Sequence, residues 1–473
     1  MPELAEYVPA EPKPGRFRRG SNTTKLHGML LKNNKFTGTW CIGMIFFEND
    51  IGVDTVKETI TKRVLQFPRF RSSYDFKRKG FVELATDELD LEGYHIKIVD
   101  ETVSVEDVQR DWIGNVYKYF DFDPSKPLWQ FTYFKNLDDG RSLLITNISH
   151  VIGDGVSQVE VLFRMMDKDE SATEVKAPKR RRKPKGRFGF LNKCYIFVEG
   201  VFTAIGSAMA TPDSEGPLMR RDPTIASEQK KISIAESISL AKLKEIKNKY
   251  HDATLNDIMV ALLTLTLHGY LDEVEGGKEF LKKKGRVRSS FLINTRSPKA
   301  KTTFRDGSPN NKIALGLLRF PLDVNSPANT VYKVKRQLDR VKLSPTPLVQ
   351  LSLANNLLKV MNEKSAAELF AAAGNQTTAM LSNVPGPQKT AYIQGHKIQD
   401  LQFGLYSSNG LYLGLISYDG KVTVGVTLDE QLGDPKEITK HWNIQFDKLY
   451  EETMKHEGMV PKPRRTFGWL DKL

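Results

Sequence analysis

Apolar residues recur along this chain at two spacings, and both spacings occur in each half of the sequence. Alternation within short apolar runs predicts strands, whereas recurrence at every third or fourth residue predicts amphipathic helices. The predicted strands are a pair over 24–48, then 143–149, 231–240, 287–296, 379–385, 401–406, 411–421 and 421–429. The predicted helices are 53–67, 104–118, 156–168, 242–251, one beginning at Asn256, and a long region over 328–373.

This mixture of strands and helices predicts an α/β layered fold made of two lobes. With 473 residues, the chain is longer than one hydrophobic core ordinarily requires, which also favours two lobes. Asp419-Gly420 between the last two strands predicts a β-hairpin. The expected boundaries are a flexible leader over 1–23, a first lobe over 24–166, a linker over 167–228 and a second lobe over 229–473.

The composition narrows the class of protein. Two cysteines are too few for a disulfide framework, and no Cys/His cluster suggests zinc, so we expect no metal and a reducing or cytosol-facing location. The sequence has neither a secretory signal nor an uninterrupted apolar run long enough to span a bilayer. The net charge of +13 is uneven, because residues 176–187 alone carry eight positive charges and no acid. A uniformly basic nucleic-acid-binding face is therefore not expected.

The stretch ITNISHVIGDGVSQVEVLF, residues 145–163, places His150 between a predicted strand and a predicted helix. A neutral imidazole can take up and return a proton near neutral pH, so His150 could act as a general base. The alternative is a polar residue that merely satisfies the end of a strand. The sequence has no GxSxG elbow and no cysteine beside a plausible base, so an acyl transfer here would proceed without an acyl-enzyme.

The residues that follow His150 in this stretch are expected to support the loop. Asp154 could orient the imidazole as in a catalytic triad, or it could fix the loop through a salt bridge or the helix N-terminus. We favour the second, because Gly153 and Gly155 suggest a tight turn that carries Asp154 away from the histidine. Those glycines would also let the backbone approach a ligand closely. Ser157 and Glu160 have the spacing of a capping box.

Five stretches, in order, resemble one family. HVIGDG resembles the end of the HHxxxDG motif of CoA-dependent acyltransferases, and FDPSKPLWQFTYF resembles the Pro-Leu-Trp motif of the wax ester synthase/diacylglycerol acyltransferases. FPRFR, ATLNDIMVALL and LSNVPGP are similar to three further segments of that family. The resemblance covers about residues 25 to 450, which is nearly the whole chain.

The resemblance implies two chloramphenicol-acetyltransferase-like lobes, each a mixed sheet flanked by helices, with a tunnel between them. Acyl-CoA would be the co-substrate, no cofactor would be bound, and the acceptor would be a long-chain alcohol or diacylglycerol. By this resemblance, His150 is the general base. Ser149 stands where the family has its first histidine. Because neighbouring residues on a strand point to opposite faces, this replacement is tolerable if His150 faces the substrate.

Further candidate substrate-binding residues lie in the other motifs. Pro127, Leu128 and Trp129 could line the acceptor tunnel or belong to the core. Asn256 and Asp257 could shape the site or simply begin a helix, and Asn383 could contact a ligand or belong to a turn. The full candidate set is His150, Asp154 and Gly155 for catalysis, and Pro127, Leu128, Trp129, Ser149, Gly153, Asn256, Asp257 and Asn383 for substrate binding.

A membrane-docking segment is expected over residues 179–206. A basic cluster precedes an apolar, aromatic stretch with helical spacing, a combination that suits anionic membrane surfaces. The predicted location is the cytosolic face of the endoplasmic reticulum or a lipid droplet. A solvated linker followed by a docking helix is the alternative. Two other functions remain open: a soluble acyltransferase of the same superfamily for small alcohols or amines, and a non-catalytic binding protein.

Overall fold

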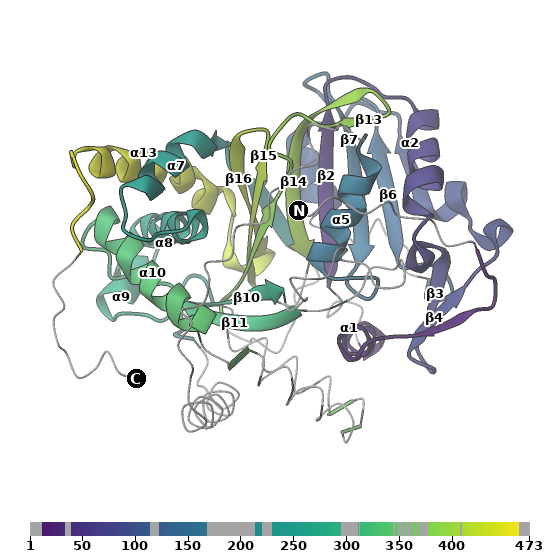
Figure 1. The fold of residues 1–473 in the computed structure, drawn as a ribbon, viewed down its shortest axis with the longest axis horizontal. Helices are drawn as coiled ribbons and strands as arrows, with labels where there is room; N and C mark the ends of the chain where they lie inside the picture. The colour runs from purple at the N-terminus through teal and green to yellow at the C-terminus, as the bar shows by residue number, and fades with distance from the viewer. Residues whose placement is uncertain are drawn as a thin grey trace.

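The computed structural model describes residues 12–33, 39–113, 123–167, 213–219, 229–294, 311, 313–343, 377–406 and 409–462, with isolated positions between 346 and 368. Two mixed sheets lie beside one another, each accompanied by helices (Figure 1). The predicted α/β class with mixed sheets is thereby confirmed.

The first sheet carries the strand that leads to His150. Its order is β13-β14-β2-β7-β6-β5, antiparallel throughout except for the parallel pair β5–β6. Its strands are β2 (Trp40–Phe47), β5 (Ile96–Val99), β6 (Trp129–Phe134), β7 (Ser142–Ser149), β13 (Tyr392–Ile393) and β14 (His396–Tyr406). Every residue of β6 and β7 is buried, including polar residues such as Gln130 and Asn147.

Helical segments flank this first sheet. They are α2 (Val53–Thr59), which continues as a π-helical stretch over Ile60–Val64, a 3₁₀ turn over Pro68–Arg71, and α5 (Gly155–Met165). The predicted helix 104–118 is observed over 105–113, as α3 (Val105–Asp107) and a π-helical stretch (Val108–Ile113). Ser104 is the N-cap of α3, and residues 114–118 lie outside the described part.

The second sheet has the order β11-β10-β12-β15-β16-β8, and β9 also pairs with β16. Its strands are β8 (Lys230–Ile234), β9 (Ile238–Ser239), β10 (Arg288–Asn294), β11 (Ile313–Arg319), β12 (Ala379–Pro385), β15 (Leu411–Tyr418) and β16 (Lys421–Asp429). Its helices are α7 (Leu240–Asn248), α8 (Leu255–Glu273), α9 (Gly277–Lys282), α10 (Pro327–Leu343) and α13 (Lys436–Met454). The predicted hairpin is confirmed, since Asp419 and Gly420 both have positive φ, as a type I′ turn requires.

The N-terminal region differs from its prediction. Phe17–Arg19 is not part of a flexible leader but forms β1, in a small sheet with β4 (Gly80–Glu83) and β3 (Ser72–Asp75). Residues 24–33 do not form a strand either. They belong to helix α1 (Asn22–Asn33), which begins after Ser21, whose hydroxyl oxygen accepts the Thr24 N–H at 3.1 Å.

Two strands from the C-terminal half of the chain belong to the first sheet. Strands β13 and β14 come from the predicted second lobe, 229–473, but complete the first sheet by pairing along β2. Strand β14 also packs against β15 and β16, and Figure 1 shows it between the two sheets. Gly414 and Gly425 make this approach possible, because a Cβ on either would lie 3.1 Å or 2.8 Å from the Phe403 carbonyl oxygen. The predicted lobe boundary therefore does not separate the two sheets.

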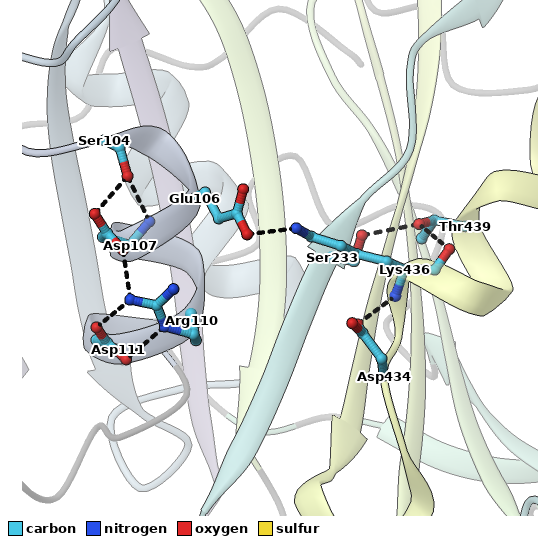
Figure 2. A network of polar contacts seen from close by, with 9 residues as sticks. All are labelled: Ser104, Glu106, Asp107, Arg110, Asp111, Ser233, Asp434, Lys436 and Thr439. Carbon is cyan, nitrogen blue, oxygen red and sulfur yellow. Dashed lines mark hydrogen bonds and ion pairs between the residues drawn. The ribbon is translucent and has the colours of Figure 1, made fainter.

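A polar network also joins the halves, at the start of α13 (Figure 2). The Lys436 ammonium donates to the Glu106 carboxylate at 2.5 Å, across from α3. Beside it, the hydroxyls of Ser233 and Thr439 lie 2.8 Å apart. Glu106 and Lys436 are both largely exposed, so this pair contributes little to stability.

Candidate active site

His150 follows the last residue of β7 and lies in a tight turn. The Ile152 N–H donates to the Ser149 carbonyl at 3.0 Å, and the His150 N–H donates to the Thr39 carbonyl at 2.9 Å. The side chain is almost wholly buried, and its Nδ1 makes no hydrogen bond with any described residue. Its backbone is thus fixed while one ring nitrogen is left unused.

The surroundings of His150 favour the neutral imidazole. Burial lowers the pKa of His150 from its ordinary value, and the Asp154 carboxylate and the Asn311 amide oppose this shift in part. At neutral pH the ring is therefore uncharged and able to accept a proton, which is the state that a general base needs.

Asp154 is the N-cap of α5. Its Oδ1 accepts the Ser157 N–H at 3.0 Å, so it fixes the loop through the helix N-terminus, as the favoured interpretation predicted. The predicted capping box of Ser157 and Glu160 is wrong, because α5 begins at Gly155 and Ser157 already lies inside its first turn. Glu160 instead pairs with Arg164 at 3.1 Å.

The two glycines of the motif do not form the turn. Neither Gly153 nor Gly155 has a positive φ, and the turn lies over residues 149–152 instead. The carbonyl of Gly153 accepts from the Gln158 amide at 2.9 Å. At Gly155, no described atom outside the adjacent residues and the backbone of α5 lies within 4 Å of the position that a Cβ would occupy. Open space beside its backbone therefore remains, as close approach of a ligand would require.

Arg69, within the FPRFR segment, supports the loop that contains His150. Its Nη1 donates to the Ile152 carbonyl at 2.7 Å, and its guanidinium lies over the Phe81 ring at 4.5 Å. Burial lowers the pKa of Arg69 to about 10, while Tyr74 and Asp154 act in the opposite direction. The side chain thus stays charged at neutral pH. The sequence marked this segment as a family resemblance at the end of a helix, but it did not predict the contact with Ile152.

A second histidine, His27 on α1, lies against His150. Their ring centroids are 4.6 Å apart, and the ring planes are inclined by 28°. Thr24, three residues earlier on the same face of α1, accepts from the Asn311 Nδ2 at 3.1 Å. Asn311 Nδ2 also donates to the His150 carbonyl at 2.9 Å. Sequence reasoning missed His27 because it assigned this segment to a strand, which hides the spacing of Thr24 and His27.

The Pro-Leu-Trp residues support the end of β7. Pro127, Leu128 and Trp129 are all buried, and the Leu128 carbonyl accepts the Ser149 N–H at 3.0 Å. Trp129 stacks on His95 at 4.2 Å, and its Nε1 donates to the Phe70 carbonyl at 2.7 Å. These are contacts of a core residue, and a tunnel-lining role stays a prediction.

Ser149 uses its side chain within the turn. Its Oγ accepts the Val151 N–H at 3.3 Å, and the residue is buried. It therefore supports the backbone beside His150, and its predicted contact with substrate stays untested.

Asn256 and Asn383 are brought together by the fold of the second half. The Asn383 Nδ2 donates to the Asn256 Oδ1 at 2.8 Å. Asp257 instead completes a capping box with Thr254, whose N–H donates to the Asp257 carboxylate at 2.8 Å. The N-cap is therefore Thr254 and not Asn256. Within the described residues, no hydrogen bond links this group to His150.

The described ranges contain no group of three or more His, Cys, Asp or Glu side chains placed to hold a metal ion. None of the described helices combines the length and the apolar character needed to cross a bilayer.

Comparison with known proteins identifies the family. The model of the wax ester synthase/diacylglycerol acyltransferase catalytic domain matches residues 53–259, and that of the family's C-terminal domain matches residues 310–450. The chain belongs to this wax ester synthase/diacylglycerol acyltransferase family. The site around His150 is therefore part of an acyltransferase.

Relatives in the family match over most of their length. Wax ester synthase/diacylglycerol acyltransferase 5 of Arabidopsis thaliana is 22% identical over 450 residues, covering 85% of this chain and 88% of that protein. Wax ester synthase/diacylglycerol acyltransferase 1 of the same plant is 26% identical over 417 residues, covering 80% of this chain and 84% of that protein.

Solved structures show the fold. The wax ester synthase/diacylglycerol acyltransferase from Marinobacter aquaeolei VT8 superposes with a TM-score of 0.59 at 16% identity, covering 92% of this chain and 100% of that one. The first condensation domain of the calcium-dependent antibiotic synthetase superposes with a TM-score of 0.57 at 13% identity, covering 93% of this chain and 97% of that one.

Proposed function

We propose that this member of the family transfers a fatty acyl group from acyl-CoA to the hydroxyl of a long-chain alcohol, of diacylglycerol, or of both. The observation that carries the proposal is His150 itself. It is a buried imidazole with a lowered pKa, at the end of a strand inside the HVIGDG motif. Arg69 and Asp154 hold the loop around it.

The proposed reaction proceeds in one transfer. A neutral His150 accepts the proton of the acceptor hydroxyl while its oxygen attacks the thioester carbonyl carbon. The tetrahedral intermediate then collapses, the carbon–sulfur bond breaks, and the CoA thiolate takes the proton from the imidazolium. The buried thiol of Cys41 does not suit an acyl-enzyme route, because burial and the nearby Asp154 raise its pKa and disfavour the thiolate.

The substrates would reach His150 between the halves of the molecule. The open space beside Gly155 would admit part of a substrate, with Gly153 next to it in the same loop. We further propose that the Asn256–Asn383 pair and the Pro127–Trp129 segment shape the walls of that path. Asp257 would act there only through the start of α8.

An assay of purified protein tests the proposal. One labelled acyl-CoA is offered with a panel of fatty alcohols, diacylglycerol and small alcohols or amines, and products are measured by mass spectrometry. We expect esters from the lipid acceptors, and at least a 100-fold loss with His150→Ala. The matched control is His441→Ala, which removes a buried histidine of α13 and should leave turnover unchanged. Undiminished turnover in His150→Ala would refute the role of this base.

We also propose that residues 179–206 attach the enzyme to an anionic membrane or lipid-droplet surface on the cytosolic face of the endoplasmic reticulum. Residues 179–206 lie outside the described part of the chain, so the support is their sequence alone. Of the predicted linker 167–228, the structure describes only residue 167 and residues 213–219. Deleting 179–206 should abolish co-flotation with vesicles containing anionic lipid. Binding that survives the deletion would contradict the proposal.

A further inference from the structure

His150 and two residues that contact it each have a buried polar atom without a hydrogen bond to any described residue. These atoms are the Nδ1 atoms of His27 and His150 and the Oδ1 of Asn311. Buried polar atoms are nearly always hydrogen-bonded, because leaving one unpaired costs stability. Three together next to the proposed base indicate a functional arrangement rather than a packing fault.

The residues that carry these atoms are firmly placed. Asn311 comes from the second half and donates through Nδ2 to both the His150 carbonyl and the Thr24 hydroxyl. With its amide nitrogen engaged, Asn311 has only Oδ1 left, and this oxygen can accept but not donate. The amide lies close enough to the His150 ring to favour its protonated form.

His27 limits the movement of the ring from another side. Its imidazole is stacked on that of His150, and α1 is fixed in turn by the contact of Gly28 with Tyr74, whose ring atoms lie 2.6 Å from where a Cβ would be. Burial, and next the neighbouring His150, lower the pKa of His27 well below its ordinary value. His27 thus stays neutral and can stack on an imidazolium without charge repulsion.

We propose that Asn311 and His27 are positioning residues for His150, with Asn311 Oδ1 accepting the Nδ1–H of the ring and the His27 ring fixing its plane. An acceptor at Nδ1 selects the tautomer that carries its proton there, and this leaves the Nε2 lone pair free to take the proton of the acceptor hydroxyl. When Nε2 is protonated, the same Oδ1 stabilises the imidazolium. The inference rests on the proposed function, because it assigns the parts of that same site.

Substitutions at Asn311 separate this role from a simple tether. Asn311→Ala removes both the Nδ2 donor and the Oδ1 acceptor, whereas Asn311→Asp removes the donor and keeps an acceptor. We expect kcat to fall roughly 10- to 100-fold in Asn311→Ala, the effect of losing one hydrogen bond to a charged group. Asn311→Asp should restore most of it. If both variants lose kcat equally, Asn311 is only a tether and the proposal is overturned.

The pH profile of kcat/KM adds a readout that a structural role would not move. Asn311→Ala removes a group that raises the pKa of His150, so its acid limb should move to lower pH. Asn311→Asp adds a negative charge, so its acid limb should move to higher pH. Unmoved limbs in both variants would also overturn the proposal.

His27 is tested by a pair of substitutions. His27→Phe keeps a stacked ring, and we expect kcat within about threefold of wild type. His27→Ala opens space for water, so kcat should fall and the acid limb should move to higher pH, because burial no longer depresses the pKa of His150 as far. Equal losses in the two variants would refute stacking as the function of His27.

Two controls separate this inference from the proposed function. His441→Ala should leave kcat and the acid limb unchanged. If His150→Ala abolishes turnover while the Asn311 and His27 variants behave as wild type, the base stands and its positioning pair fails. If His150→Ala retains turnover, the proposed function fails first. Melting temperatures of all variants show whether each chain is folded.

Discussion

Replacing Asp154 by asparagine and, separately, by alanine perturbs the loop that holds His150 in two different ways. Both substitutions remove a buried carboxylate that acts on Arg69 and on His150. Only alanine also removes the oxygen that accepts the Ser157 N–H, because asparagine caps a helix about as well as aspartate. The pair therefore separates the helix cap from the charge.

The expected magnitudes follow from these contacts. Loss of an N-cap costs about 0.5–2 kcal/mol, so Asp154→Ala should be less stable than Asp154→Asn by about 1 kcal/mol. Both should be less stable than wild type, because Arg69 keeps its buried charge while a nearby carboxylate is gone. Urea unfolding followed by circular dichroism measures both differences.

Catalysis provides the second readout. The Asp154 carboxylate raises the pKa of His150, so both variants should move the acid limb of kcat/KM to lower pH. An aspartate that oriented the base as in a triad would instead cost about 10⁴-fold in kcat on replacement by asparagine. We expect Asp154→Asn to lose about tenfold or less. A 10⁴-fold loss, or equal unfolding midpoints for the two variants, would refute the assignment of Asp154 as a helix cap.

Three further predictions use other contacts. Gly425→Ala should destabilise the protein by about 1–3 kcal/mol, because its Cβ would lie 2.8 Å from the Phe403 carbonyl oxygen. An unchanged midpoint of urea unfolding would contradict the close packing of β14 against β16. Gly155→Ala should leave the urea midpoint nearly unchanged, because no described atom beyond its neighbours and its own helix lies within 4 Å of its Cβ position. KM should rise if a substrate occupies that space, and an unchanged KM would argue against such a contact. His27 and His150 have folded-state pKa values below the ordinary 6.5, so the unfolded chain binds more protons and stability should fall as pH drops below 6.5. His27→Phe should reduce that slope of unfolding free energy against pH, and an undiminished slope would contradict a buried neutral His27.

The sequence predicted what local patterns encode. The β7–α5 junction that holds His150 is one example, since a buried apolar run and a helical spacing flank a short polar loop. The hairpin at Asp419-Gly420 is another, because the turn type requires those residues. The family resemblance added the expected chemistry of His150, which periodicity alone left open.

What the sequence missed depends on contacts between distant residues. Ser149 and Asp154 were interpreted from their neighbours, but His27 and Asn311 reach His150 from 123 and 161 positions away along the chain. Neither lies in a motif, and the predicted strand pair over 24–48 included the residues that form the end of α1. A helical assignment would have placed Thr24 and His27 on one face.

The pairing of β14 with β2 affects how the chain can fold during synthesis. Residues 40–149 contribute four strands of the first sheet, but β2 has no partner on its other side until residues 396–406 have been synthesised. A nascent first half must therefore wait, with one backbone edge open to pairing, while about 250 more residues emerge at roughly 5–20 residues per second. Such an edge invites association with other chains. A chain cut within residues 167–228 would keep that edge of β2 permanently open, so we expect its first half not to fold on its own.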